Sequence, residues 1–195
     1  AVIISHTHAD HCLDIPFLLW YKEDYRNENE ELSTKIITDK VTQNTVKNLI
    51  ELSHFNSAKK AKKEFIDAEE VNNIEKIFDD VQILNEPMEH EHINIKYANG
   101  YIIKDKNISI GLTGDTTFCQ GVKEIASKVD YLISDMTLEV GDNSHMGIDN
   151  ILELLKEYPH LKIIPIHMHD KTRKKAMKLN IDNLMILQDG DILQL

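Results

Sequence analysis

The sequence predicts a mixed α/β fold built as a single domain over residues 1–195. Short apolar runs of the length of buried strands alternate with longer segments whose apolar residues recur at helical spacing. Hydrophobic residues form 42% of the chain and charged residues 28%, which supplies enough apolar material for one proper core. No apolar run reaches the roughly 18 to 20 residues of a membrane span, so we expect no association with a membrane.

Strands are predicted where apolar residues alternate, or follow one another, between turn residues. Residues 108–112 alternate and run into Thr113-Gly114-Asp115, while residues 163–166 are apolar throughout. Pro165 marks an end or edge there, because proline cannot donate to the ladder. A turn is expected at Asn99-Gly100. The expected strands are residues 2–4, 35–38, 93–97, 101–104, 108–112, 129–135 and 163–166.

Helices are predicted over residues 43–63, 71–78 and 149–158, where apolar side chains fall on one face. Residues 23–32 are acidic and amide-rich, which indicates a solvated loop or helix face. A basic stretch near the C-terminus indicates a surface helix, although a substrate phosphate nearby would give it a role in steering. Its members are Lys171, Arg173, Lys174, Lys175 and Lys178.

The segment after the first predicted strand offers four potential metal ligands within six residues, namely His6, His8, Asp10 and His11. A turn that follows a strand can fold these side chains around a common point. Imidazole nitrogen together with carboxylate oxygen suits zinc, iron or manganese. The alternative is a histidine-rich solvated turn, which the density of ligands in an HxHxDH pattern makes the poorer interpretation.

Further candidate ligands follow the later strands. Gly114 lets the backbone turn sharply, so that the Asp115 carboxylate points off the end of its strand. His167 comes first after the apolar run 163–166, and His169 is its rival two residues on. Another histidine is expected in a loop before the strand pair that leads to Asp115, where His90 and His92 both qualify. His54 falls inside the helical pattern 43–63 and is predicted to be a surface residue.

These motifs resemble the signature of the metallo-β-lactamase superfamily, the αββα hydrolases with a mono- or dinuclear metal centre. The resemblance implies an αββα sandwich, and the spacing before Gly100-Tyr101 in such proteins favours His92 over His90. Two divalent ions, most simply zinc, with manganese or iron as alternatives, would share a bridging hydroxide that attacks the substrate. The implied ligands are His6, His8 and His92 on one ion, Asp10, His11 and His167 on the other, and Asp115 as the bridge; Asp10 is also expected to be catalytic.

His145 lies between Asp115 and His167, ahead of the predicted helix 149–158. In ribonuclease Z and the phosphodiesterase of the phosphonate pathway, a histidine in a similar position contacts the scissile phosphate and can protonate the leaving oxygen. The resemblance to that branch implies the same role for His145. The alternative is a loop histidine with no task. Carboxylates such as Asp135 could fix imidazole tautomers in such a centre.

The favoured hypothesis is therefore a phosphodiesterase acting on a small-molecule or short nucleotide phosphodiester. A net charge of −11 argues against binding long nucleic acid. The tRNA-processing relatives carry a glycine- and proline-rich arm, whereas this chain has no glycine between residues 1 and 99. Hydrolysis of a carboxylic ester, lactone or thioester is the alternative, and a binding or redox module is a third reading. A homodimer is compatible with the sequence.

Two further expectations concern the setting of the chain. Cys12 and Cys119 are too few for a disulfide framework, which favours a reduced, cytoplasmic environment. Superfamily members place their first strands before the HxHxDH turn, whereas this sequence opens at Ala1 inside the predicted strand. We therefore expect an N-terminally truncated sandwich, a fragment that lacks the first strands.

Overall fold

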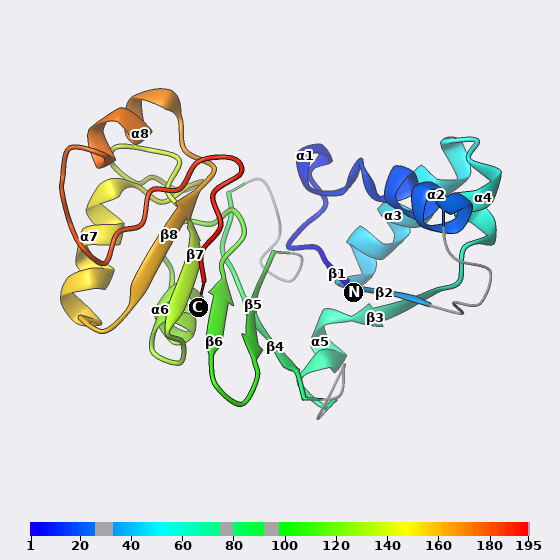
Figure 1. The fold of residues 1–195 in the computed structure, drawn as a ribbon, viewed down its shortest axis with the longest axis horizontal. Coiled ribbons are helices and arrows are strands. Elements are labelled where there is room, and N and C mark those ends of the chain that lie inside the picture. The colour runs from blue at the N-terminus through cyan, green and yellow to red at the C-terminus, as the bar shows by residue number, and fades with distance from the viewer. Residues whose placement is uncertain (26–32, 75–79, 92–97, 195) are drawn as a thin grey trace. The chain divides into compact units, whose positions relative to one another are not determined.

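The computed structural model describes residues 1–25, 33–74, 80–91 and 98–194. The chain divides into two compact units, Ala1–Val71 (unit 1) and Asn72–Leu195 (unit 2), and each combines a sheet with helices (Figure 1). The mixed α/β class predicted from the sequence is confirmed. Within the described ranges, no helix is both long enough and apolar enough to cross a bilayer.

Unit 1 contains a parallel sheet in the order β1-β2-β3. Its core contains three fully buried side chains, Leu19, Ile36 and Val46, which come from two helices and the middle strand. Burial of these apolar side chains packs the helices against the middle strand. The elements are β1 (Val2–Ile3), α1 (Ala9–Cys12), α2 (Ile15–Tyr25), β2 (Thr34–Thr38), α3 (Lys40–Leu52), α4 (Asn56–Lys60), β3 (Lys63–Asp67) and α5 (Ala68–Val71).

The predicted helix over residues 43–63 is wrong in its second half. Helix α3 ends at Leu52, and His54 then takes a left-handed backbone conformation with φ of 59°. The chain resumes as the short helix α4 and continues into β3, which the helical pattern concealed. The Lys63 ammonium donates to three carbonyl oxygens at the end of α4, which satisfies groups that a helix terminus leaves unpaired. Of the helix predicted over 71–78, Val71 ends α5, and residues 75–79 lie outside the described residues.

Unit 2 contains a five-stranded sheet in the order β4-β5-β6-β7-β8. Strands β4, β5 and β6 pair antiparallel, whereas β6, β7 and β8 pair parallel. The turn predicted at Asn99-Gly100 is wrong, because both residues belong to β5 and pair with β4. The strand predicted over 93–97 lies outside the described residues. The elements are β4 (Gln82–Pro87), β5 (Asn99–Lys104), β6 (Ser109–Leu112), α6 (Gln120–Ala126), β7 (Tyr131–Asp135), α7 (Ile148–Glu157), β8 (Lys162–Ile166) and α8 (Asp170–Ala176).

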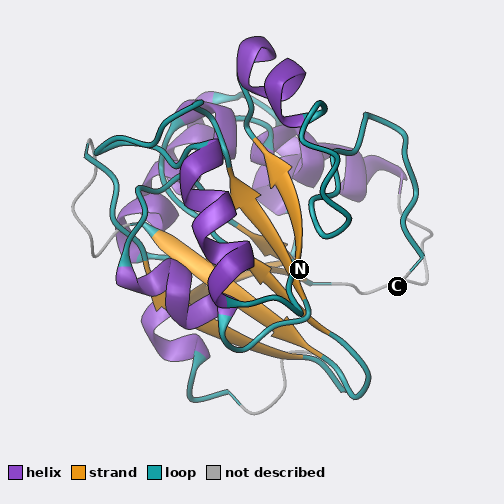
Figure 2. Ribbon diagram, turned by 90° about the vertical axis from the view of Figure 1, so that its left-hand side faces the viewer, coloured by secondary structure: helices purple, strands orange, loops and turns teal. Residues whose placement is uncertain are grey.

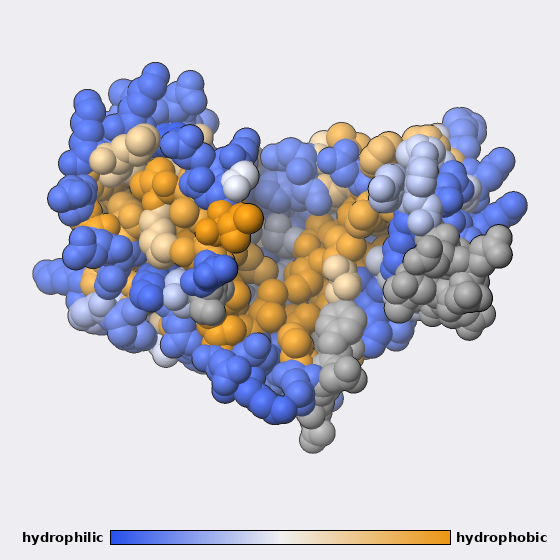
Figure 3. Space-filling model, in the orientation of Figure 1, coloured by the Kyte–Doolittle hydropathy of each residue, from blue (hydrophilic) through white to orange (hydrophobic). Residues whose placement is uncertain are grey.

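Helices α6, α7 and α8 share one core with a face of this sheet. Figure 2 shows helices in front of part of the strands. A Cβ on Gly111 would lie 2.3 Å from Ile125 Cγ2, so a glycine is needed for α6 to pack this closely. Apolar side chains also gather over β4, β5 and β6 in Figure 3. The strand register aligns one residue from each strand on the helix-covered face: Leu84, Ile102, Gly111, Leu132 and Ile163.

The parallel arrangement of β6, β7 and β8 determines where chemistry can occur. Their carboxyl ends meet at one edge of the sheet, so the residues that leave each strand converge there. Asp115 follows β6, Asp135 ends β7 and His167 follows β8. These positions are far apart in sequence, and the strand order alone brings them together.

Candidate metal and catalytic centre

In unit 1, the HxHxDH turn leaves the sheet after Ile4, whose amide donates to the Ile37 carbonyl. His8 precedes α1, and the His11 amide closes the turn onto the His8 carbonyl. The His6 ring centroid lies 4.6 Å from that of His8 and 4.1 Å from that of His11. His11 Nε2 lies 3.4 Å from Asp10 Oδ2. The turn thus gathers imidazole and carboxylate ligand atoms within unit 1 itself.

Cys12 directly follows this turn and is buried. Burial raises the pKa of its thiol, and the charge of Asp10 raises it further. The sulfur lies within hydrogen-bond distance of the Thr7 and His8 carbonyls, so the thiol acts as a donor to the turn. These properties fit an ordinary buried thiol that supports the turn, since a metal ligand would need the thiolate.

In unit 2, Asp115 and His167 face each other at the carboxyl edge of the sheet. Gly114 has φ of 62°, which is the sharp turn that the sequence predicts ahead of the carboxylate. His167 has φ of 59°, an uncommon conformation for a non-glycine residue and one that clusters at functional sites. The His167 Nε2 atom lies 3.5 Å from Asp115 Oδ2. His169, the rival candidate, is the exposed residue that caps the start of α8.

Asp135 is a fully buried carboxylate at the end of β7. Its Oδ1 accepts from the backbone N–H and the hydroxyl of Thr137, at 2.9 and 2.7 Å. Its Oδ2 accepts from the Thr116 N–H at 3.1 Å and from His145 Nδ1 at 2.8 Å. These four bonds replace the solvent that burial removes and fix the carboxylate against His145.

The pKa of His145 is raised above its ordinary 6.5, mainly by the hydrogen bond to Asp135, although partial burial opposes the shift. Its loop is held by Asp142, whose carboxylate accepts from the backbone N–H groups of Ser144 and His145. The His145 and His167 rings stack with centroids 5.2 Å apart. His145 therefore lies beside Asp115 and His167 in a fixed orientation.

His90 is a buried histidine that approaches the same edge. Its Nδ1 lies 2.8 Å from the Ser144 carbonyl oxygen, an acceptor only, so Nδ1 must carry the proton. The neutral ring then offers Nε2 as a ligand, and His90 and Asp115 offer ligand atoms within 4.8 Å of each other. His92, which the sequence favours, lies outside the described residues, and His54 is an exposed residue between α3 and α4.

The donor set at this edge fits a divalent metal ion. Asp115, His145 and His167 offer ligand atoms that all lie within 4.8 Å of one another. Nitrogen and carboxylate oxygen are the ligands of zinc and other first-row metals, and ligating imidazoles characteristically donate their second N–H to a protein acceptor. His90 meets that requirement through Ser144.

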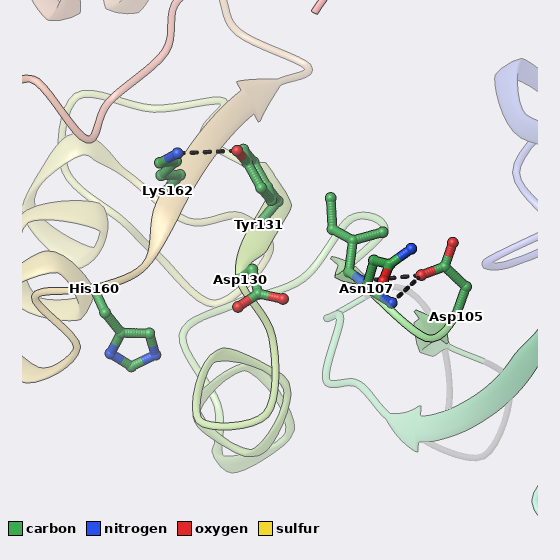
Figure 4. Close-up of a pocket in the computed structure, with 7 residues that line it drawn as sticks. Asp105, Asn107, Asp130, Tyr131, His160 and Lys162 are labelled. Atoms are coloured by element: carbon green, nitrogen blue, oxygen red, sulfur yellow. Dashed lines mark hydrogen bonds between the residues drawn. The ribbon is translucent and has the colours of Figure 1, made fainter. Parts of the chain in front are cut away.

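The surface cavity of unit 2 in Figure 4 lies at the opposite edge of the sheet. Ile108, Asp130 and Lys162 line it, and they stand at the starts of β6, β7 and β8. Lys162 donates to the Tyr131 hydroxyl, and the carboxylate of Asp105 accepts from the backbone of its own loop. This cavity is therefore separate from the ligand atoms at the carboxyl edge.

The predicted basic helix is present as α8, with Lys178 beyond its end. Lys171 and Lys175 lie 2.6 and 2.7 Å from the two Glu139 carboxylate oxygens and lower the pKa of Glu139 to about 2. Arg173 donates to the Leu187 carbonyl. These three charges anchor α8 to its neighbours, so the surface-helix interpretation accounts for them.

Thr137 was not anticipated from the sequence. Its hydroxyl contacts Asp135 and also lies 2.8 Å from His167 Nδ1. The only sequence signal is its position two residues after a strand that ends in a carboxylate. That position indicates a contact with His167 only when the pairing of β7 with β8 is known.

Comparison with known proteins supports the same family as the motifs. The family model described as "Beta-lactamase superfamily domain" matches residues 1–168. No curated protein sequence matches the chain. A diphosphatase of the PhnP family, of solved structure, aligns with a TM-score of 0.72 at 16% identity, over 99% of this chain and 70% of that one.

Two further solved structures share the fold. The short form of human tRNase Z aligns with a TM-score of 0.66 at 17% identity, over 98% of this chain and 77% of that one. An isothiocyanate hydrolase from Delia radicum gut bacteria aligns with a TM-score of 0.65 at 17% identity, over 100% of this chain and 76% of that one. At these identities the likeness concerns the fold, while the substrates named for these proteins differ.

Proposed function

Because the chain belongs to the β-lactamase superfamily of metal-dependent hydrolases, we propose that it hydrolyses phosphodiesters of small molecules or short nucleotides. The observation that carries the proposal is the pairing of His145 with buried Asp135 beside Asp115 and His167. A histidine held in this way can donate a proton to a leaving alkoxide, the step that a phosphodiester with a poor leaving group needs most.

We propose that the chain binds two divalent ions, most simply zinc. This assignment is supported by the family membership and by the donor chemistry of each unit taken separately. When bound, two such ions lower the pKa of a shared water and stabilise the charge on attacking and leaving oxygens. The proposed ligands are His6, His8, Asp10 and His11 of unit 1, with Asp115, His167 and either His90 or His92 of unit 2. Asp10 is also proposed to be catalytic.

His145 would perform the acid step through the nitrogen that does not face Asp135. Its Nδ1–H donates to Asp135 Oδ2, which leaves Nε2 for the substrate. The raised pKa keeps the ring protonated to a higher pH than an ordinary histidine, which favours the acid form. The Asp142 contacts hold the loop and limit how far the ring can turn.

The test is a comparison of leaving groups in the full chain loaded with zinc or manganese. We expect turnover of bis(p-nitrophenyl) phosphate and of a dinucleotide with an alkoxide leaving group. His145→Ala should slow the dinucleotide about 10²- to 10⁴-fold, and should slow the p-nitrophenyl ester far less because p-nitrophenolate departs without a proton.

His160→Ala is the matched control, because His160 lines the cavity at the opposite edge of the same sheet. It should leave both rates unchanged. Absence of phosphodiester turnover, or equal effects of His145→Ala on both substrates, would contradict the proposal. Cleavage of a lactone or thioester that is indifferent to His145→Ala would instead favour the alternative, a carboxylic ester, lactone or thioester hydrolase.

The choice between His90 and His92 is tested by metal content. The contacts of His90 support it as a ligand, because its Nδ1 proton is engaged by Ser144. We therefore expect His90→Ala to lower the zinc bound per chain, whereas His92→Ala, the ligand favoured by the sequence resemblance, leaves it near the wild-type value. Zinc analysis after dialysis measures both variants, and the reverse result would show that His92 is the ligand.

A further inference from the structure

Thr137 lies where the exits of β7 and β8 meet, and its backbone is fixed on both sides. Its N–H donates to Asp135 Oδ1, and its carbonyl accepts from the His169 N–H at 3.2 Å and from the Thr172 hydroxyl at 2.8 Å. The residue is 2% exposed. The Thr137 hydroxyl is therefore attached to a backbone held by hydrogen bonds and is shielded from solvent.

The Thr137 hydroxyl has three polar side-chain neighbours: Asp135 Oδ1, His167 Nδ1 and, at 3.3 Å, His145 Nδ1. His145 Nδ1 already donates to Asp135 Oδ2 at 2.8 Å, so its longer contact with the hydroxyl does not decide where the hydroxyl proton lies. Thr137 Oγ1 has one proton, and its 2.7 Å contact with the charged Asp135 Oδ1 requires that the proton lies there. The 2.8 Å contact between Oγ1 and His167 Nδ1 must then be a bond that the histidine donates. In a neutral His167 ring the proton is consequently on Nδ1, and the Nε2 that faces Asp115 carries a lone pair.

The same carboxylate therefore orients two imidazoles by different routes. His145 donates directly to Asp135 Oδ2, whereas His167 is reached only through the Thr137 hydroxyl. His167 needs such a restraint, because its backbone is in the left-handed region with φ of 59° and its side chain is one-third exposed. A buried threonine with a purely structural hydroxyl would need the bond to Asp135 alone.

We propose that Thr137 is a positioning residue that relays the charge of Asp135 to His167 and fixes its Nδ1–H tautomer, so that Nε2 is ready to bind a metal ion. The proposal rests on the metal-binding part of the proposed function, since it assigns His167 as a ligand. It does not depend on which ester is cleaved. Its test can therefore succeed when the substrate assignment fails.

The test is ¹⁵N NMR of the histidine side chains in the metal-free full chain at pH 8.5, well above the ordinary histidine pKa of about 6.5. His167→Asn identifies the His167 signals by their loss. In the wild type we expect the Nδ1–H tautomer, and in Thr137→Val, which removes the hydroxyl at nearly constant volume, a shift toward Nε2–H. In Thr137→Ser the Nδ1–H tautomer should return.

Zinc titration against a chromophoric chelator gives the second measurement. Thr137→Val should weaken zinc binding about 10- to 100-fold, the usual effect of losing a partner that orients a ligand, and Thr137→Ser should restore most of it. Thr172→Val is the matched control, because Thr172 is equally buried and its hydroxyl donates to the Thr137 carbonyl rather than to a histidine.

Three results would overturn the proposal. A wild-type His167 in the Nε2–H form refutes it without any variant, including the case in which Thr137→Val fails to fold. An unchanged tautomer and unchanged zinc affinity in Thr137→Val does so as well. Equal losses of zinc affinity in Thr137→Val and Thr172→Val, with His167 still Nδ1–H in both, would assign Thr137 a merely structural role.

Discussion

At the residue scale, the raised pKa of His145 depends mainly on its hydrogen bond to the Asp135 carboxylate, to which the carboxylate charge adds. Asp135→Asn replaces the charged acceptor by a neutral one and should lower the His145 pKa toward its ordinary value. Because the folded pKa lies above the unfolded value, the stability that this pair contributes is complete below pH 6.5 and is lost as the pH rises through the folded pKa. The variant should lose that contribution, and an NMR titration of the metal-free protein measures the pKa directly.

The same substitution should move the pH profile of phosphodiester turnover. If protonated His145 is the acid, activity falls as the pH rises through its pKa, and Asp135→Asn should shift that alkaline limb to lower pH. Asp130→Asn is the control, since Asp130 stands at the opposite edge of the sheet and binds Ser109. An unmoved limb in Asp135→Asn would exclude His145 as the titrating acid.

Residues that directly follow an apolar run were the ones that the sequence could identify as candidate ligands. His167 comes directly after β8, and Asp115 comes three residues after the end of β6, so both positions at strand exits could be predicted from local pattern. The Thr137–His167 contact could not be predicted, because it spans 30 residues and depends on β7 pairing with β8. The role proposed for the Thr137 hydroxyl can be inferred only after its single proton is assigned to one of its hydrogen-bond partners.

At the element scale, the boundaries of α3 follow from capping rather than from apolar periodicity. Asp39 precedes the helix, and its Oδ1 accepts from the N–H groups of Val41 and Thr42 at 2.8 and 2.9 Å. The predicted start at residue 43 overlooked this cap. The predicted continuation to residue 63 failed because the left-handed His54 breaks the helix, which periodicity of side chains does not register.

Removal of this cap should destabilise the protein measurably. Asp39→Ala removes the carboxylate that accepts from two backbone N–H groups and, at 2.6 Å, from the Thr42 hydroxyl. We expect the free energy of unfolding to fall by about 1 to 2 kcal/mol, measured by urea denaturation. Asp39→Asn should retain most of the stability because its side-chain oxygen still caps the helix, and equal losses in both variants would point to the charge instead.

At the scale of the whole molecule, the candidate ligands are divided between two compact units. Each unit orders its own ligands: the HxHxDH turn by local bonds, and Asp115 and His167 by the strand exits of the second sheet. The α/β class was predictable because buried strands and amphipathic helices have different periodicities. The division into two units was not, since no glycine- or proline-rich linker marks it.

Zinc binding should protect the candidate ligand segments of each unit. Saturating zinc should slow amide hydrogen exchange around residues 6–12, and likewise around residues 113–117 and 167–169. Free zinc at about 1,000 times its Kd stabilises the bound state by about 4 kcal/mol per site, which sets the upper limit of the protection that one ion gives. His6→Ala should reduce the protection around residues 6–12, and unchanged exchange in a segment would show that its residues are not zinc ligands.

The left-handed backbone at His167 determines which substitution removes the imidazole without also disturbing the backbone. Alanine in that conformation carries a steric cost of about 1 to 2 kcal/mol, because its Cβ crowds the following carbonyl oxygen, whereas asparagine adopts it comparatively readily. An alanine variant would thus combine a missing ligand with a relaxed strand exit, and any fall in activity would have two causes. Asparagine keeps the path of the chain while removing the imidazole, so a mutagenesis survey of this edge of the sheet should use it as the reference substitution.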